Sequence, residues 1–518
     1  MKNINIFLYL ILFLFFVFLT FSECKKKSEI VTSTSTVNSS PSTINLTIYP
    51  DSVLNTFDVT NPVGINLNFF NDNDSFLNPS RKLSAALSEM GVKYLRYPGG
   101  DKSDYYFFSA PPFSEAIATP CQTGPGSNAS RADFFNNDRT AYNRAVLNFD
   151  ECMVLAREAG AEPVITCAID TYMQVPDSMP GATTATKTST RAQYLQNAVE
   201  WVRYANITHN YKIKYWMLGN ETWVAYYQSP FGTWYGDDPL TYAKDLIDFS
   251  SAMKAVDPSI KIIANGVDWT VQKYLPIAAN YIDYICTSNY PDKYNSYDDW
   301  VQQCTAHTDN LTTVMQNVLS MIDACGSISV SKKASLKVWA SEFGPHDFSG
   351  QGWGNYQNLG KAMLNFDIIG QELSNPRFMI SLFWNTRWMG HGQYYNYDAL
   401  DDNNNFSPDG QTLALWNNFI YPQMIQTNSA AGFLTFATCD NINHSIYYYI
   451  INQKANAAAI SLSIPNKSIS SIQFAGEMKG DNPQSSYTTY FLNGKNVVNA
   501  SNLLLDPYSI SVFRISYK

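Results

Sequence analysis

The sequence contains few histidines, and its cysteines and histidines form no pattern that predicts a metal site. The five histidines are scattered without a His-Glu-x-x-His pair, and the eight cysteines include no Cys-x-x-Cys pair. We therefore expect a protein that needs no metal or cofactor. Seven cysteines follow Cys24, so at least one of them is unpaired. Cys167 and Cys286 fall within predicted strands and are expected to be buried thiols.

Positive charge is also scarce. Lys and Arg number 35 against 44 Asp and Glu, which gives a formal net charge of −9. An acidic chain lacks the basic surface that binds nucleic acid or an anionic membrane, so we expect neither partner. No internal repeat of solenoid period is present. The 518 residues are 45% hydrophobic and 14% aromatic, which is enough for one large domain and a smaller partner. The oligomeric state stays open.

The only long apolar run lies at the N-terminus. Residues 1–23 combine a basic start, an apolar stretch and a polar exit, which predicts a signal peptide. An uncleaved membrane anchor and a lipoprotein with a lipidated Cys24 are the alternatives. Residues 24–44 are rich in Ser and Thr and predict a disordered tether. We expect a protein that is secreted or resides in the endolysosomal lumen, without membrane insertion after cleavage. Its glycosylation acceptors include Asn38, Asn45, Asn73, Asn128, Asn206, Asn310, Asn405, Asn443, Asn466 and Asn499.

Short apolar runs alternate with helical patterns eight times between residues 45 and 425. The runs are apolar throughout, which is typical of parallel strands covered by helices. Eight strand–helix pairs predict an α/β fold, the (β/α)8 TIM barrel, with its active site at the carboxyl ends of the strands. The predicted strands are 63–70, 92–97, 163–169, 213–218, 260–264, 282–286, 336–340 and 378–384. The predicted helices are 78–90, 143–159, 191–205, 239–256, 271–279, 310–324, 355–373 and 412–420.

A different pattern covers residues 426–518. Strand-like segments at 445–451, 459–464, 486–491 and 509–515 are separated by turns, which predicts a C-terminal antiparallel β-sandwich domain. A short strand at 47–49 is expected to join this domain before the chain enters the barrel.

Two glutamates follow strands of the predicted barrel. Strand 213–218 runs into Gly219-Asn220-Glu221, and strand 336–340 runs into Ser341-Glu342. Two carboxyl groups that face each other across a sugar can hydrolyse a glycosidic bond, one as an acid and the other as a nucleophile. We therefore expect Glu221 to be the acid/base and Glu342 the nucleophile, with their carboxyl groups about 5 Å apart, as retaining hydrolysis requires.

These motifs resemble those of clan A glycoside hydrolases, and most closely those of the family 51 α-L-arabinofuranosidases. The resemblance rests on Leu95-Arg-Tyr-Pro-Gly-Gly100, on Trp216-x-x-Gly-Asn-Glu221 and on the terminal segment 505–514, and it spans about residues 45–518. It implies a retaining enzyme that removes terminal α-L-arabinofuranosyl groups from plant or microbial polysaccharides. Three positions depart from the family's pattern. Asp101 stands where the family usually has Asn, Asn289 where it has His, and Phe343 where it has Trp.

Position in the barrel suggests roles for the remaining polar and aromatic residues. Asn220 is expected to bind the sugar 2-hydroxyl, and Arg96 to favour the ionised form of Glu342. Tyr290 is expected to orient Glu342, and Trp384 to form the floor of the site. Asp101 and Asn289 complete the predicted substrate-binding set. Further sugar contacts are expected from the aromatic loop after Glu221, with Trp223, Tyr226, Tyr227, Trp234 and Tyr235.

Two alternative functions stay open at this point. The same scaffold and carboxyl pair serve glucuronidases and endo-glycanases, so the sugar, its ring form and its anomer are not fixed by the motifs. A non-catalytic carbohydrate-binding protein is the alternative outside the enzymes, and the presence of both glutamates argues against it. In either case the partner is an oligosaccharide or polysaccharide.

Overall fold

The computed structural model describes residues 43–120, 142, 144–169, 191–223, 238–291, 294–345, 353–354, 357–387, 398–492, 494, 496–497 and 502–518. The predicted signal peptide and almost all of the predicted tether lie outside these residues, as do Tyr226, Tyr227, Trp234 and Tyr235 of the aromatic loop. Within the described part, no helix combines the length and the apolar character that crossing a membrane requires.

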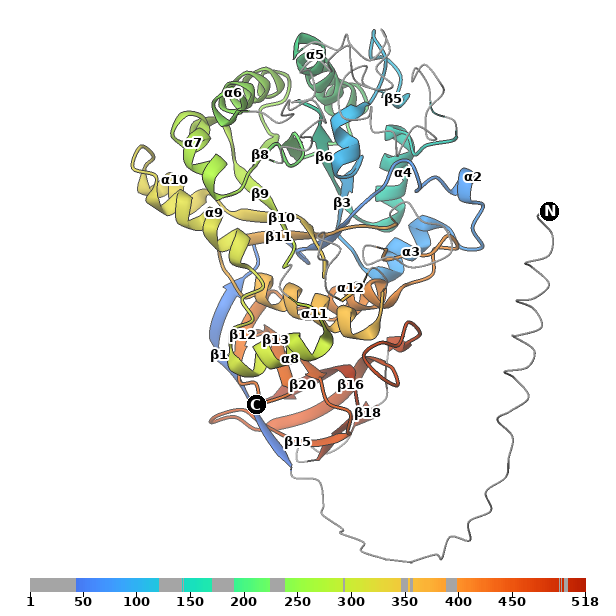
Figure 1. Cartoon of the computed structure of the whole chain (residues 1–518), viewed down its shortest axis with the longest axis vertical. Coiled ribbons are helices and arrows are strands. Elements are labelled where there is room, and N and C mark those ends of the chain that lie inside the picture. Colours follow the sequence, from blue (N-terminus) through green and yellow to red (C-terminus); the bar gives the residue numbers. More distant parts are fainter. Residues whose placement is uncertain are drawn as a thin grey trace, which may run out of the picture. The chain divides into compact units, whose positions relative to one another are not determined.

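Eight parallel strands close into a barrel, as predicted, with helices around it (Figure 1). Each strand pairs in parallel with the next along the chain, and the last pairs with the first. In chain order the strands are β2 (Val63–Asn66), β3 (Tyr94–Tyr97), β6 (Glu162–Cys167), β7 (Tyr215–Leu218), β8 (Lys261–Asn265), β9 (Tyr284–Asn289), β10 (Val338–Phe343) and β11 (Phe378–Phe383).

A helix follows each barrel strand, which confirms the eight predicted strand–helix pairs. They are α3 (Leu83–Met90), α4 (Phe149–Ala159), α5 (Arg191–Val202), α6 (Pro239–Val256), α7 (Asp268–Ala278), α9 (Thr313–Ala324), α11 (Leu359–Leu373) and α12 (Pro408–Asn418). α6 has the bounds expected from the sequence because its start is well marked. Asp238 caps two backbone N–H groups of the first turn, and Pro239 occupies the first helical position.

Among the described residues, three further α-helices were not predicted: α2 (Asp74–Leu77), α8 (Tyr297–Ala306) and α10 (Val330–Ser335). α8 lies between β9 and α9, in a segment for which no helix or strand was predicted. It carries its own signals, since Ser296 caps the N-terminus and Tyr297, Trp300 and Cys304 recur at helical spacing on its buried face.

The side chains that point into the barrel change character along the strands. Tyr94, Val164 and Tyr215 belong to an apolar cluster that also includes Trp339 and Leu382. Two residues further along β3 and β6 are the polar side chains of Arg96 and Thr166. Because successive side chains of a strand alternate between its two faces, each polar residue lies on the same interior face as the apolar one before it. The lower barrel is therefore an apolar core, and its carboxyl end is a polar site.

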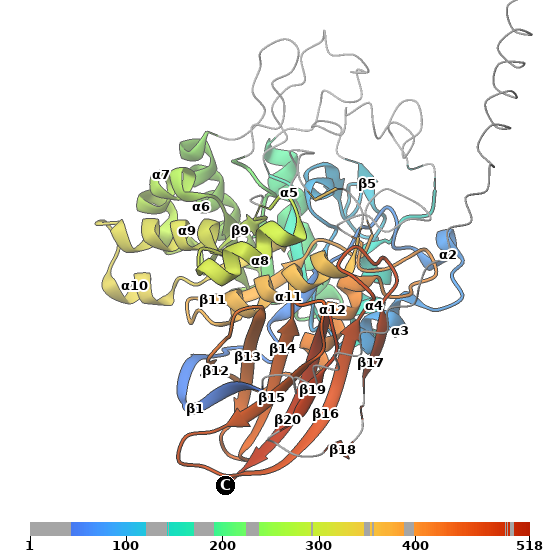
Figure 2. The same ribbon diagram turned by 60° about the horizontal axis from the view of Figure 1, so that its bottom comes forward.

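Besides β4 (Tyr106–Phe107) and β5 (Thr119–Pro120), which pair as a separate two-stranded sheet, the remaining strands form the β-sandwich (Figure 2). β1 (Ile44–Thr56) joins its two sheets, because residues 44–47 pair with β15 and residues 48–56 pair with β12. The β1–β15 pairing is parallel, whereas the other pairings of the sandwich are antiparallel among the described residues. The other strands are β12 (Gln423–Thr427), β13 (Phe433–Asp440), β14 (Ser445–Asn452), β15 (Ala458–Ser463), β16 (Ile469–Lys479), β17 (Thr489–Leu492), β18 (Asn496–Val497), β19 (Leu503–Leu505) and β20 (Ser509–Tyr517).

Helices α11 and α12 join the barrel to the sandwich. Gly370 of α11 lies against the Phe436 ring of β13, and Leu415 of α12 lies against Gly476 of β16. α11 is buried along nearly its whole length, which explains why its sequence is apolar on most sides. The cysteines of the described residues are all free, and Cys167 and Cys286 are buried thiols as expected.

Candidate active site

Arg96 lies at the centre of the polar end of the barrel. Its guanidinium group is 1% exposed and donates to side chains from four other strands or strand ends. Nη1 contacts Glu342 Oε1 at 2.8 Å and Asn66 Oδ1 at 2.9 Å, Nη2 contacts Asn220 Oδ1 at 2.7 Å, and Nε contacts Thr166 Oγ1 at 3.1 Å. A planar fork of donors fixes several partners at once, so Arg96 sets the relative positions of Asn220 and Glu342.

Glu342 is held through both of its carboxylate oxygens. Oε1 accepts from Arg96, and Oε2 accepts from Tyr290 Oη at 2.9 Å. The residue is 5% exposed and lies in β10, where a register irregularity toward β9 occurs between Ala340 and Glu342. An adjacent cation and a hydrogen-bond donor both favour an ionised carboxylate. The site thus presents an oriented carboxylate, which is the state that a nucleophile requires.

Asn220 has one half of its amide engaged and the other half without a protein partner. Its Oδ1 accepts from Arg96, whereas Nδ2 is buried and makes no hydrogen bond to any described residue. Since the Arg96 contact fixes which end of the amide is the oxygen, the amide N–H group is the free one. A buried donor without a partner is costly, and a sugar hydroxyl would satisfy it.

Glu221 follows Asn220 at a sharp turn after β7. Gly219 and Glu221 both have a positive φ, 76° and 43°, which is uncommon for a residue with a side chain. Asn265 at the end of β8 holds this turn, because its Oδ1 accepts from both Thr222 N and Thr222 Oγ1 at 2.8 Å and its Nδ2 donates to Leu218 O. Such strain persists only where the surroundings enforce it, and it is frequent at functional sites.

Gly100 packs between Glu342 and Trp384. A Cβ atom at this position would lie 2.4 Å from Glu342 Oε1 and 2.4 Å from Trp384 Cη2, so only glycine fits. Trp384 is 3% exposed and follows β11, and the Nζ of Lys102 lies 5.1 Å from the centroid of its ring. Gly99, the preceding residue, has a φ of 137°, a backbone conformation that residues with a side chain rarely adopt. The close approach at Gly100 is an additional requirement that the sequence did not indicate.

Of the predicted substrate-binding residues, Asn289 is directed away from this centre, and the side chain of Asp101 is not among those described. The Asn289 amide donates to Glu372 Oε1 at 2.7 Å and to the Leu311 carbonyl at 3.0 Å, and therefore points toward α11 and the segment before α9. Asp101 begins the 3-10 helix η1 (Asp101–Tyr105), and its side chain lies outside the described part. The roles of both residues in substrate binding stay predictions.

Sequence reasoning missed the residues that support the site. Asn66, Thr166 and Asn265 are polar residues inside strands, and each fixes a predicted site residue or the turn that carries it. In the structure Asn66 ends β2 and pairs with Arg96 of β3, whereas the predicted strand 63–70 placed Asn66 inside the strand, so nothing in the sequence indicated its role.

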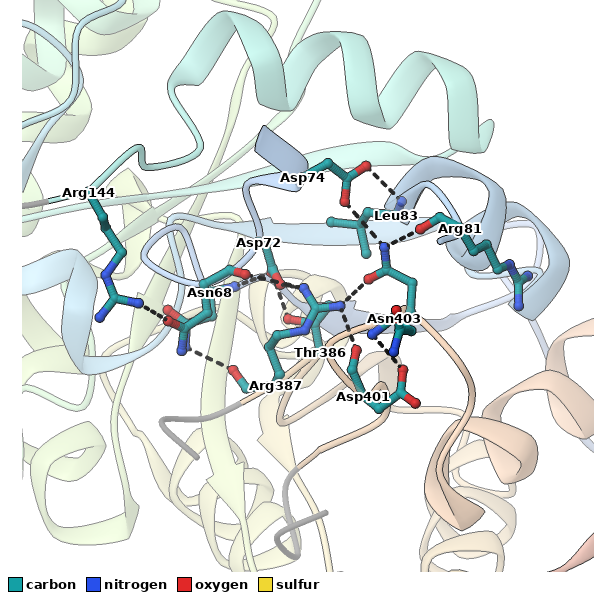
Figure 3. Close-up of polar contacts among 12 residues, drawn as sticks. Asn68, Asp72, Asp74, Arg81, Leu83, Arg144, Thr386, Arg387, Asp401 and Asn403 are labelled. Atoms are coloured by element: carbon teal, nitrogen blue, oxygen red, sulfur yellow. Dashed lines mark hydrogen bonds and ion pairs between the residues drawn. The ribbon is translucent and has the colours of Figure 1, made fainter. Parts of the chain in front are cut away.

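A buried ion pair also joins the loops after β2 and β11 (Figure 3). Arg387 Nη1 lies 2.6 Å from Asp72 Oδ1, while Asp72 Oδ2 accepts from Thr386 Oγ1 at 2.6 Å. Asn68 adds a hydrogen bond from its amide to the Arg387 carbonyl at 2.8 Å. The acid and the arginine are 1% and 3% exposed. Because Arg387 lies three residues after Trp384, this network anchors the chain that carries the indole.

Comparison with known proteins gives a consistent picture. Residues 86–310 match the family model described as "Alpha-L-arabinofuranosidase 1 domain". A "Probable alpha-L-arabinofuranosidase C" from Aspergillus fumigatus is 26% identical over 204 residues, which cover 36% of this chain and 32% of that protein. Its counterpart from Aspergillus flavus is 32% identical over 93 residues, which cover 15% and 17%. The chain resembles the family 51 α-L-arabinofuranosidases. The match to the curated relatives spans about a third of their length or less.

Solved structures extend the resemblance to the whole fold. The α-L-arabinofuranosidase of Thermotoga maritima superposes with a TM-score of 0.64 at 15% identity, covering 91% of this chain and 99% of that one. A Paenibacillus polymyxa xyloglucanase of family 44 superposes with a TM-score of 0.57 at 11% identity, covering 92% and 99%. At these identities the likeness establishes the barrel with its C-terminal sandwich. The family match at 86–310 includes Arg96, Asn220 and Glu221, but not Glu342 or Trp384.

Proposed function

We propose that this protein is a retaining glycoside hydrolase with Glu342 as nucleophile and Glu221 as acid/base. The observation that carries the proposal is the Glu342 carboxylate, buried and fixed by Arg96 and Tyr290, in a site that Arg96 also ties to Asn220, the neighbour of Glu221. A carboxylate with both oxygens held in place is preorganised for attack on an anomeric carbon.

The reaction proceeds by double displacement. Glu342 attacks the anomeric carbon and forms a covalent glycosyl ester, while Glu221 gives its proton to the departing glycosidic oxygen. Glu221, now ionised, removes a proton from water, and the water oxygen attacks the same carbon and releases Glu342. The free N–H of Asn220 donates to the sugar 2-hydroxyl, an interaction that strengthens in the transition state. Two inversions give net retention of the anomeric configuration.

The sugar we propose is a terminal α-L-arabinofuranosyl group on a plant or microbial polysaccharide. Support comes from the family model at residues 86–310 and from the names of the relatives. The second candidate is a glucuronidase or endo-glycanase on the same scaffold. It is favoured by Asp101, Asn289 and Phe343, which depart from the family's pattern, and by the structural likeness to a xyloglucanase.

The assignment of the two glutamates can be tested with Glu342→Ala and Glu221→Ala. Each variant is assayed on an aryl-glycoside panel that includes arabinofuranosides, xylosides and glucuronides, with and without azide. Both should lose wild-type turnover by about 10³-fold or more, as loss of a nucleophile or acid/base predicts. With azide on an activated substrate, Glu342→Ala should form the glycosyl azide of inverted configuration and Glu221→Ala that of retained configuration.

Glu158→Ala, an exposed position on α4, is the matched control and should behave as wild type. Turnover by Glu342→Ala at the wild-type rate would overturn the nucleophile assignment. If the wild-type protein hydrolyses no member of the panel but binds polysaccharide, it is the non-catalytic binding protein instead. Preference for uronides or for internal cleavage of a polymer would select the second enzyme candidate.

We also propose that the protein is secreted, or delivered to the endolysosomal lumen, after removal of residues 1–23. The charged start, apolar run and polar exit of this segment support the proposal. N-terminal sequencing of the mature protein should find a start near residue 24. An intact Met1 would favour a membrane anchor, and a blocked, lipidated Cys24 would favour a surface lipoprotein.

A further inference from the structure

A second polar site lies away from Glu342, where α8 and α11 meet the sandwich. A cavity of about 390 Å³ opens there, lined by residues of α8 and α11, by the segment 429–432 before β13 and by Gln453 after β14. None of the candidate catalytic residues lines it. Its polar lining comes mainly from Cys304, His307, Asp309, Asp367, Gln371 and Gln453.

Three of these side chains converge in the way that metal ligands do. The thiol of Cys304 and one carboxylate oxygen each of Asp309 and Asp367 all lie within 4.8 Å of one another. Ligand atoms on a zinc ion, with bonds of about 2.0–2.3 Å, are roughly 3.5 Å apart in a tetrahedral site. Adjustments of about an ångström, within the reach of side-chain rotation, would therefore seat an ion.

The two carboxylates are already oriented by neighbouring donors. Gln371 Nε2 donates to Asp309 Oδ2 at 3.1 Å and to Asp367 Oδ1 at 3.2 Å, and Trp300 Nε1 donates to Asp367 Oδ2 at 3.2 Å. Contacts of this kind, behind the ligand atoms, hold the ligands of metal sites in place.

Gln453 provides an independent indication of a ligand. Its side chain is 4% exposed and lines the cavity, yet neither Oε1 nor Nε2 has a hydrogen-bond partner of normal geometry. A buried amide with both ends unsatisfied is expensive unless something in the cavity binds it.

The charge balance of the cavity points to a cation. No Lys or Arg is among its described lining residues, so two acidic side chains meet without a strong positive partner. Burying a carboxylate without a compensating charge is costly, and a bound cation removes that cost.

We propose that Cys304, Asp309 and Asp367 bind a zinc-class divalent cation, with a water on the fourth position that hydrogen-bonds to Gln453. The thiolate selects Zn²⁺ over the hard cations Ca²⁺ and Mg²⁺, which prefer all-oxygen sites. His307 belongs to the same segment, Cys304-x-x-His307-x-Asp309, and lines the cavity beside the ligands. This spacing was not recognised in the sequence. The ion would join α8 to α11, and the water would link it to Gln453 of the sandwich.

The test uses the full-length, chelator-treated protein and measures metal binding rather than activity. Zn²⁺ should bind with one-to-one stoichiometry in calorimetry and raise the Tm, because a ligand that binds only the folded state stabilises it. Co²⁺ should give the near-ultraviolet charge-transfer band of a thiolate ligand. Cys304→Ser should remove the band, and Asp367→Asn, which is isosteric with the protonated acid and should fold, should weaken Zn²⁺ binding about 100-fold or more.

Cys325→Ser is the matched control, because Cys325 is a free cysteine outside the cavity, and it should keep both signals. Binding of less than one equivalent, or a Co²⁺ band that survives in Cys304→Ser, would overturn the proposal. Tighter binding of Ca²⁺ than of Zn²⁺ would also overturn it. The readout is metal binding and not turnover. Absence of Zn²⁺ binding would therefore not bear on the proposed hydrolase activity, and absence of hydrolase activity would not bear on the proposed metal site.

Discussion

At the scale of single residues, Arg96 determines the geometry of the candidate site. Lysine at this position keeps the charge but loses the planar fork that reaches Asn66, Thr166, Asn220 and Glu342 together. We expect Arg96→Lys to lower kcat/KM by about 10²–10³-fold and to cost about 3 kcal/mol of folding stability, because the buried ion pair with Glu342 would lose its hydrogen-bond geometry. Steady-state kinetics and thermal unfolding check this. The control Arg203→Lys, at an exposed ion pair, should change neither.

Tyr290 contributes to the site through its hydroxyl, which donates to Glu342 Oε2 at 2.9 Å. A hydrogen bond to a charged group is worth about 1.5–3 kcal/mol, so Tyr290→Phe should lower kcat about 10- to 100-fold. The ring remains, so the variant should fold, with a Tm that falls by only a few degrees. Tyr487→Phe, at a 91% exposed position, is the control. Unchanged kcat in Tyr290→Phe would remove the orienting role.

The residues at the strand ends could be predicted, and most of their partners could not. Arg96, Asn220, Glu342 and Tyr290 follow from counting strands, since barrel chemistry gathers where the strands end. Their convergence is visible only in three dimensions. Asn289 shows the limit, because a strand-end position does not say which way an amide points, and here it points toward Glu372.

At the scale of elements, the periodicity of apolar residues predicted the strands and helices of the barrel but not the additional short helices. The eight strand–helix units were predicted because each has a buried strand and a helix of several turns. α8 and α10 were missed because ten and six residues give few repeats of the helical period. In the sandwich, β13 and β16 were missed although they are long, since their apolar and polar residues do not alternate strictly.

Gly370 of α11 tests the contact between barrel and sandwich. Alanine normally stabilises a helix relative to glycine by about 1 kcal/mol. At Gly370, however, a Cβ would lie 2.4 Å from two atoms of the Phe436 ring. We therefore expect Gly370→Ala to destabilise the protein by about 1–3 kcal/mol, measured by chemical unfolding. Gly326→Ala, where nothing lies within 4 Å, should change stability by less than about 0.5 kcal/mol. A gain in stability in Gly370→Ala would show that the Phe436 ring moves to make room for the methyl group.

At the scale of the whole molecule, the sequence predicted two domains but not how they are joined. The joint is polar as well as apolar, since Asp367 and Glu372 of α11 and Asp409 of α12 are all buried. An acid in a helix is usually at the surface, and sequence alone cannot identify the exceptions. Each of these acids costs stability in its charged form, so the joint should respond to pH.

Glu372 gives the clearest pH test, because burial raises its pKa to about 7 from an ordinary value of 4.5. Below pH 4.5 the acid is protonated in both the folded and the unfolded protein, and burial carries no charge penalty. Between pH 4.5 and 7 only the unfolded chain releases the proton, so stability falls as pH rises and is lowest above 7. Glu372→Gln stays neutral and keeps an oxygen for Asn289.

The unfolding free energy of Glu372→Gln relative to wild type should therefore rise with pH, by up to about 3 kcal/mol between pH 4.5 and 8. Chemical unfolding at four or five pH values measures the difference. Glu158→Gln, at an exposed site on α4, should give a difference that does not vary with pH. A flat profile for Glu372→Gln would mean that the carboxyl group ionises in the folded protein as readily as in the unfolded chain. Solvent would then have to reach the interface between α11 and the barrel strands.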